Sequence, residues 1–87
     1  MHAVVVRVTI KDVEPSLSDL RENVVPQVAQ APGFVAGYWT RSGNSGISMM
    51  VFESEEAATA VSERIPSTVP ETVTLEDVEV REVVAHA

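Results

Sequence analysis

The fold of this chain is decided by residues 34–57, which read FVAGYWTRSGNSGISMMVFESEEA. Two runs rich in β-branched and aromatic residues, Phe34–Arg41 and Ile47–Glu53, flank a loop of Gly, Ser and Asn. Such a loop is short enough to join two antiparallel strands in a hairpin. Ser54 follows at once with Glu55 and Glu56 behind it, which is typical of a helix N-cap and an acidic first turn. The stretch therefore predicts a strand, a turn, a second strand and a helix in direct succession.

The residues before this stretch predict a strand followed by a helix. Val4–Ile10 is a β-branched run whose even positions form an apolar face. A helix opens at Pro15, with Ser16 or Ser18 as its N-cap, and Pro32-Gly33 ends it. Its apolar residues recur at helical spacing, at Leu17, Leu20, Val24 and Val28. Pro26 removes one backbone hydrogen bond within the helix, so we expect a kink or an irregular turn there.

The residues after the stretch predict the end of a helix and one more strand. Pro66 is expected to close the helix that begins at Ser54, and Pro66–Glu71 to form a loop. The last strand lies within Val73–Ala85 and is clearest at Val78–Val84. The element order is βαββαβ, so residues 1–87 are expected to form one ferredoxin-like α+β domain. Its two helices would cover one face of a four-stranded antiparallel sheet.

Apolar residues also fall on the sheet face that the helices leave uncovered. By strand parity we assign Val5, Met50, Phe52 and Val83 to that open face. Val fills 17 of the 87 positions, which is more apolar sheet than two helices can cover. A second copy of the sheet would cover the open face, so we expect a homodimer with two-fold symmetry.

Composition excludes several classes of partner. The chain has 13 acidic and 6 basic residues and a net charge of −7, with the basic residues scattered. Binding to nucleic acid or to an anionic membrane surface is disfavoured, because both require basic side chains. No apolar stretch approaches the roughly 18 residues of a membrane span, and no basic region precedes the first apolar run. We therefore expect a cytoplasmic protein; the chain has no cysteine, so it has neither disulfides nor thiolate metal sites.

Four side chains are candidates for a ligand pocket: Arg7, Trp39, Met50 and Phe52. The aromatic residues, Phe34, Tyr38, Trp39 and Phe52, come from two adjacent strands and would suit a flat, apolar ligand. Ordinary core or dimer packing would account for at least two of them equally well. Tyr38 and Trp39 point to opposite faces of their strand, so only one of the two can line a given cavity.

Two arginines interrupt apolar strands. A buried Arg7 would need either a ligand anion or a structural partner, because an unpaired buried charge is costly. Glu53, Glu79 or Glu82 could be that partner. Arg41 ends its strand and is expected to be solvated.

The remaining chemistry-bearing residues favour no catalytic site. His2 and His86 could act as a base or supply two ligands of a metal, but frayed, solvated termini are the favoured explanation. The Gly43–Gly46 loop lacks the helix and the Lys of a phosphate-binding loop. We expect no bound cofactor and no metal.

The chain resembles the dimeric α+β barrel superfamily, and within it the antibiotic biosynthesis monooxygenase type of domain. The resemblance rests on Pro32–Tyr38 and on Phe52–Ala57. It implies a ferredoxin-like subunit whose sheet pairs with that of a second subunit to form a barrel. It also implies a cavity in each subunit for a flat aromatic polyketide, a quinol or haem. Active monooxygenases of this type oxidise their substrate with dioxygen and without metal or flavin.

Three departures from the family pattern restrict the activity. Phe52 occupies the strand position that often holds a cavity Trp, and Trp39 on the neighbouring strand is its candidate replacement. Haem-degrading members also have an Asn on the first strand and a His on the second helix, and this chain has neither. Haem degradation is therefore disfavoured. Two hypotheses stay open. The first is a barrel that binds, or binds and oxidises, a small aromatic or quinone-like molecule; the second is a non-catalytic ligand-binding or interaction module.

Overall fold

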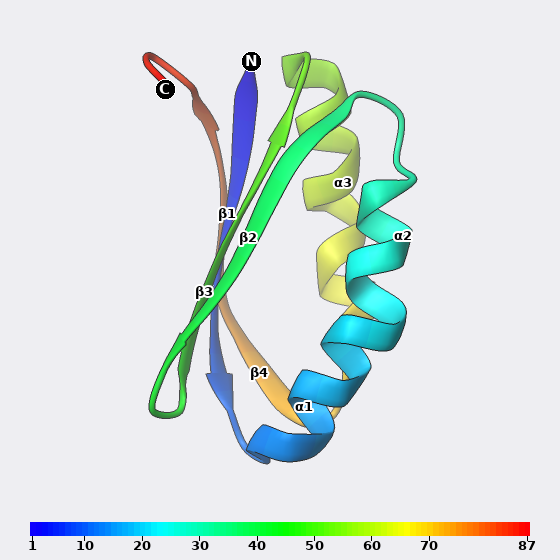
Figure 1. Ribbon diagram of the computed structural model, residues 1–87, viewed down its shortest axis with the longest axis vertical. Helices are drawn as coiled ribbons and strands as arrows, with labels where there is room; N and C mark the ends of the chain where they lie inside the picture. Colours follow the sequence, from blue (N-terminus) through cyan, green and yellow to red (C-terminus); the bar gives the residue numbers. More distant parts are fainter.

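Four strands and two helical segments make up the computed structural model, which describes residues 1–87 (Figure 1). The strands are β1 (His2–Ile10), β2 (Phe34–Ser42), β3 (Ser45–Phe52) and β4 (Val73–Glu82). The first helical segment consists of α1 (Val13–Asp19), η1 (Leu20–Val24) and α2 (Val25–Ala29), and the second is α3 (Glu55–Thr68). Both helical segments lie on the same side of the sheet. The predicted βαββαβ order is confirmed.

The sheet has the order β2-β3-β1-β4, and each neighbouring pair is antiparallel. The two central strands, β1 and β3, are therefore the first and third in sequence, as the ferredoxin-like fold requires. Register places Val4 opposite Met50 on one side and opposite Val80 on the other. Because facing residues share a side of the sheet, this register decides which side chains meet the helices.

The core lies between the sheet and the helices. Its fully buried members are Val4, Val6, Met50, Phe52 and Ala58. Phe52 is completely buried, and its ring meets that of Phe34 edge to face at 5.9 Å between centroids. The even positions of β1 therefore face the helices, as their pattern predicts.

A two-residue turn joins β2 to β3. β2 ends at Ser42 and β3 begins at Ser45, so Gly43 and Asn44 form the turn. Gly43 has φ +59°, which glycine adopts without the steric cost that a Cβ would add. The predicted hairpin is confirmed, with strands longer than expected at both ends of the turn.

The first helical segment is interrupted rather than merely kinked. The five residues of η1 form a π-helical turn directly before Pro26, which lies in the first turn of α2. Since Pro26 has no N–H to donate, the backbone upstream of it is released from the regular α-helical pattern. The expected irregularity is thus present and spans Leu20–Val24.

The predicted start of this segment is wrong. The helix begins at Val13, with Asp12 at the N-cap position, and Ser16 lies inside the first turn. The Ser16 hydroxyl donates to the backbone oxygen of Asp12 at 2.7 Å and approaches that of Thr72 at 3.3 Å. Ser16 therefore ties α1 to the loop before β4 instead of capping the helix.

The second helix begins as expected and ends later than expected. The Ser54 hydroxyl accepts a hydrogen bond from the Ala57 backbone N–H at 3.1 Å, which confirms it as the N-cap. The helix runs past Pro66 to Thr68, so the expectation that Pro66 closes it is wrong. A proline in the last turn leaves only the Ser62 carbonyl without its helical donor, which costs less than a break in the middle of a helix.

The open face of the sheet is apolar, but two of the residues assigned to it lie elsewhere. Met50 and Phe52 face the helices and are buried in the core, because β3 has the opposite parity to the one assumed. Register instead places Met49 beside Val5 and Tyr38 on the open face. Large apolar side chains are strongly exposed there, with Tyr38 at 67%, Ile47 at 47% and Met49 at 45%.

Candidate functional site

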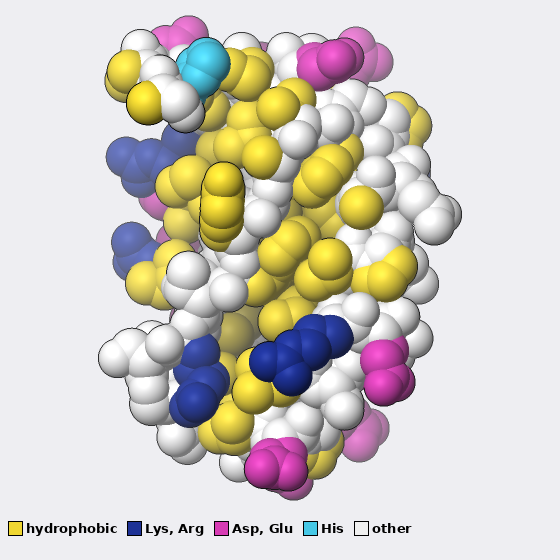
Figure 2. Space-filling view, viewed as in Figure 1, with side chains coloured by type: hydrophobic (Ala, Val, Ile, Leu, Met, Phe, Trp, Pro, Cys, Tyr) yellow, Lys and Arg dark blue, Asp and Glu magenta, His cyan; other side chains and the backbone are white.

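A hollow of about 440 Å³ lies between the first helical segment and the sheet. In Figure 2 the apolar surface sinks inward between the sheet and the helices, and basic side chains lie beside this opening. The hollow exists because the first helical segment stands away from the sheet: none of the residues of η1 or α2 is buried.

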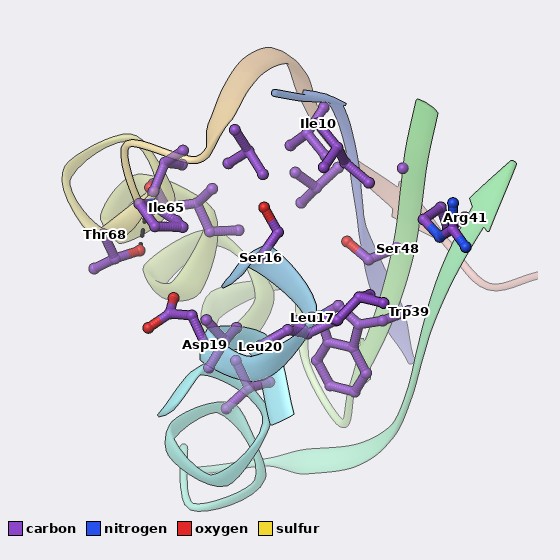
Figure 3. Close-up of a pocket in the computed structure, with 18 of the residues that line it drawn as sticks. Ile10, Ser16, Leu17, Asp19, Leu20, Trp39, Arg41, Ser48, Ile65 and Thr68 are labelled. Carbon is purple, nitrogen blue, oxygen red and sulfur yellow. Dashed lines mark hydrogen bonds between the residues drawn. The ribbon is translucent and has the colours of Figure 1, made fainter. Parts of the chain in front are cut away.

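Residues from almost every element line the hollow (Figure 3). The helical wall carries the apolar stripe predicted for this segment, which consists of Leu17, Leu20, Val24 and Val28. The sheet supplies the floor, made by Val6, Val8, Ile10, Trp39, Arg41, Gly46, Ser48 and Met50. The end of α3 and the following loop close one end, through Ile65, Thr68, Val69, Pro70 and Val73. Of the 23 lining residues 13 are hydrophobic, so the hollow suits an apolar molecule.

Trp39 provides the aromatic surface of the hollow. Its ring folds back over Gly37: a Cβ at Gly37 would lie 2.7 Å from the Trp39 ring. Glycine at this position therefore leaves room for the indole to lie along the strand. Trp39 is half-buried and also packs against the core, so one side of it is supported by the protein.

Two ionisable side chains line the hollow, Arg41 on β2 and Asp19 at the end of α1. Figure 3 shows them on opposite sides. The Asp19 carboxylate accepts a hydrogen bond from the Asn23 amide at 2.7 Å, which links the end of α1 to η1. Arg41 donates to the backbone oxygen of Gly43 at 2.9 Å. The hollow is thus apolar in the middle, with charges of opposite sign at its sides.

The four candidate pocket residues are separated by the structure. Trp39 and Met50 line the hollow. Phe52 lies on the same side of the sheet but within the closed core, completely buried. Arg7 lies on the open face, where it is exposed and faces Asp77 and Ile47 across the neighbouring strands.

Arg7 is therefore exposed to solvent and does not require an ion-pair partner. None of the three glutamates suggested for it forms an ion pair with it; Glu79 pairs with Arg81 at 2.9 Å instead. The reason is parity: odd residues of β1 face away from the helices, as the exposed Arg7 and Thr9 do. Of the two arginines, Arg41 borders the hollow, and its side chain is exposed, as its place at a strand end predicted.

The histidines differ from each other. His2 is part of β1, and its Nε2 lies 3.4 Å from a carboxylate oxygen of Glu55 at the start of α3. It is therefore not frayed, and its Nδ1 is buried without a hydrogen-bond partner. His86 is exposed beyond the end of β4. No group of three or more His, Cys, Asp or Glu residues is arranged to hold a metal ion.

Sequence reasoning missed Arg41 and Gly46 as parts of the site. A signal for Arg41 was present, because residues 39 and 41 of one strand face the same side. Gly46 on β3 lies opposite Arg41 on β2, and a Cβ on Gly46 would lie 2.8 Å from a methyl group of Val8. That Gly46 lies beside Arg41 depends on the register between β2 and β3, which the sequence of either strand alone does not reveal.

The overall architecture has a counterpart among solved structures. The chain is similar to a mutant of MhuD whose crystal structure contains two manganese protoporphyrin IX molecules per active site. The TM-score is 0.62 at 17% identity, and the match covers 98% of this chain and 97% of that one. The chain therefore shares its α+β fold, a four-stranded antiparallel sheet with two helical segments on one face, with that protein. No family model matches the sequence, and no curated protein matches it.

None of the helices has the length and apolar character needed to cross a membrane. The longest is α3, with 14 residues, and it carries four charged side chains, Glu55, Glu56, Glu63 and Arg64.

Proposed function

We propose that this protein binds a flat, largely apolar small molecule in the hollow between the first helical segment and the sheet. One observation carries the proposal: a hollow of about 440 Å³ with an apolar lining and one aromatic ring, Trp39, on its wall. Sites for small molecules usually enclose about 300–1,000 Å³ and combine an apolar lining with few polar groups. Aromatic faces add stacking to this apolar contact.

The shared fold supports a ligand of this shape. The MhuD structure, which holds porphyrins in its active site, covers nearly the whole length of this chain. A porphyrin is a flat, mostly apolar molecule. The resemblance to small monooxygenases points to ligands of that shape as well, such as polyketides and quinols.

Trp39 makes the binding proposal directly measurable. It is the single tryptophan of the chain, so all tryptophan emission originates at the wall of the hollow. Titration with an anthraquinone or with protoporphyrin IX should quench that emission and reach saturation. Leu20→Arg places a charge on the helical wall and should weaken binding at least tenfold. Val84→Arg, at a residue that is 87% exposed, is the matched control. Quenching that never saturates, or that Leu20→Arg leaves unchanged, would contradict binding in the hollow.

Oxidation of the bound molecule by dioxygen is a second candidate function, and Asp19 favours it. Cofactor-independent oxygenation begins when a proton leaves the substrate, and Asp19 is the one carboxylate among the lining residues. Oxygen uptake with an anthrone or a quinol should rise in the presence of the protein and fall in Asp19→Asn. Uptake that the protein does not change would leave a non-catalytic binding module, the alternative that the same fold allows.

We further propose that two copies pair through their open sheet faces. The exposed Tyr38, Ile47 and Met49 support this, since each such side chain contributes about 1.5–3 kcal/mol when fully buried, before the costs of association. Sedimentation at micromolar concentration should show a dimer, and Met49→Glu should shift it towards the monomer. A wild-type monomer under these conditions would refute the pairing.

A further inference from the structure

Arg41 is the only basic side chain among the residues that line the hollow. None of the 13 acidic residues pairs with it. A carboxylate partner is also absent for Arg7, Lys11, Arg21 and Arg64. What distinguishes Arg41 is therefore its place at the edge of an apolar hollow.

The Arg41 side chain is exposed, and its guanidinium makes one hydrogen bond within the protein. One N–H, on Nη1, donates to the backbone oxygen of Gly43 at 2.9 Å. A guanidinium has five N–H donors in a planar fork, which matches the two oxygens of a carboxylate or a sulfonate. The hairpin turn therefore anchors Arg41 by a single contact and leaves a fork available to an anion.

No side chain projects from the sheet directly beside Arg41, because the neighbouring residue is a glycine. Gly46 on β3 lies opposite Arg41 on β2, and a side chain at Gly46 would collide with Val8. Trp39, two residues before Arg41 on the same face, folds back over Gly37, away from Arg41. Both residues face the same side of β2, so an elongated molecule that lies along the floor can contact the indole at one end and the guanidinium at the other.

The opposite side of the hollow disfavours an anion. Figure 3 shows Asp19 there, at the end of α1. Its carboxylate accepts a hydrogen bond from Asn23. A negative group would be repelled by Asp19 and attracted by Arg41, so the two charges favour one orientation of a polar ligand.

We infer that the ligand is an aromatic acid, whose ring lies against Trp39 and whose anionic group is held by Arg41. This inference rests on the proposed binding function and adds the charge and the orientation of the ligand. Carboxylates and sulfonates share the required chemistry.

Two dyes that differ by one group test the inference. Anilinonaphthalene sulfonate and its uncharged analogue phenylnaphthylamine have the same aromatic skeleton, and energy transfer from Trp39 reports their binding near the hollow. The wild-type protein should bind the sulfonate more tightly. Arg41→Gln should weaken the sulfonate about tenfold, as expected for loss of a charged hydrogen bond, and change the uncharged dye by less than about twofold. High salt should narrow the preference of the wild type for the sulfonate.

Arg7→Gln is the matched control, because it removes the same charge from the opposite face of the sheet. It should change neither affinity by more than about twofold. If Arg41→Gln weakens both dyes equally, or if Arg7→Gln weakens the sulfonate as much, the role of Arg41 is overturned while binding in the hollow stands. If neither dye binds the wild type, the proposed function fails and this inference fails with it.

Discussion

The two helical segments cover the same face of the sheet but do so in different ways. α3 is regular and capped by Ser54, and its Ala58 is completely buried in the core. Around it Ala57, Val61 and Ile65 also pack against the core. The first segment is interrupted by a π turn, has no side-chain cap, and contributes only Val28 to that packing.

This difference explains how a chain of 87 residues leaves a hollow beside its core. Small side chains on α3 let the helix approach the sheet closely, so the space beneath it is filled. Larger side chains on the first segment, Leu17 and Leu20, reach towards the sheet without closing on it and become the wall of the hollow. The second segment therefore contributes more to stability, and the first forms the wall of the candidate site. Substitutions that shorten or enlarge single side chains can test this division.

The largest effect is expected from truncation on the side of α3. Phe52→Ala should lower the free energy of unfolding by about 3–5 kcal/mol, because Phe52 is completely buried and its removal leaves a cavity. Leu20→Ala, on the wall of the hollow, should cost about 1 kcal/mol, since Leu20 is only half-buried. Urea unfolding at one fixed protein concentration measures both. Equal losses would contradict the proposed division.

Larger side chains should lower stability in the core beneath α3 and lower ligand affinity at the hollow. Ala58→Leu should cost about 1–3 kcal/mol, because Ala58 is completely buried and a larger side chain there overpacks the core. Val24→Phe should change stability by less than about 0.5 kcal/mol, because the added ring can enter the hollow. The same Val24→Phe substitution should weaken dye binding several-fold. A stable Val24→Phe variant with unchanged dye affinity would show that the ligand binds elsewhere.

The helix caps offer a smaller contrast. Ser54→Ala removes the hydrogen bond to the Ala57 N–H and should cost about 1 kcal/mol. Asp12→Asn, at the N-cap position of α1, should cost about 0.5 kcal/mol, because Asp12 makes no side-chain cap hydrogen bond and only its charge is lost. Thermal unfolding of the two variants ranks these effects, and a larger loss for Asp12→Asn would contradict the structure of the α1 cap.

The smallest perturbation requires no substitution. Backbone amides of η1 and α2 should exchange hydrogen faster than those in the middle of α3, because their residues are not buried. A bound aromatic acid should slow exchange in the first segment and leave α3 unchanged. Uniform protection of both segments would show that the first is not the more mobile one.

Much of the fold could be predicted because local patterns agree with it. The β-branched run at Val4–Ile10, the Gly43 turn and the Ser54 cap each specify their element through backbone preferences that neighbours do not alter. Errors occurred where tertiary contacts decide. Ser16 is drawn to the loop before β4 rather than to a cap, and Pro66 is tolerated in a last turn that packing supports.

The candidate site was only half predictable. The helical stripe and Trp39 follow from periodicity, so the sequence indicated the apolar wall and the aromatic ring. Met50 and Phe52 were assigned to the wrong face, because parity on β3 can be decided only by its pairing with β1. The same register brings Gly46 beside Arg41 and separates Arg41 from Arg7.

The sequence by itself determined the element order, the α+β class and the excess of apolar sheet, since each depends on residues close together in the chain. The tertiary structure alone decided which arginine borders the hollow and which aromatic ring is core. Those choices depend on strand register and on how far a helix stands from the sheet, and both are set by contacts between residues distant in sequence.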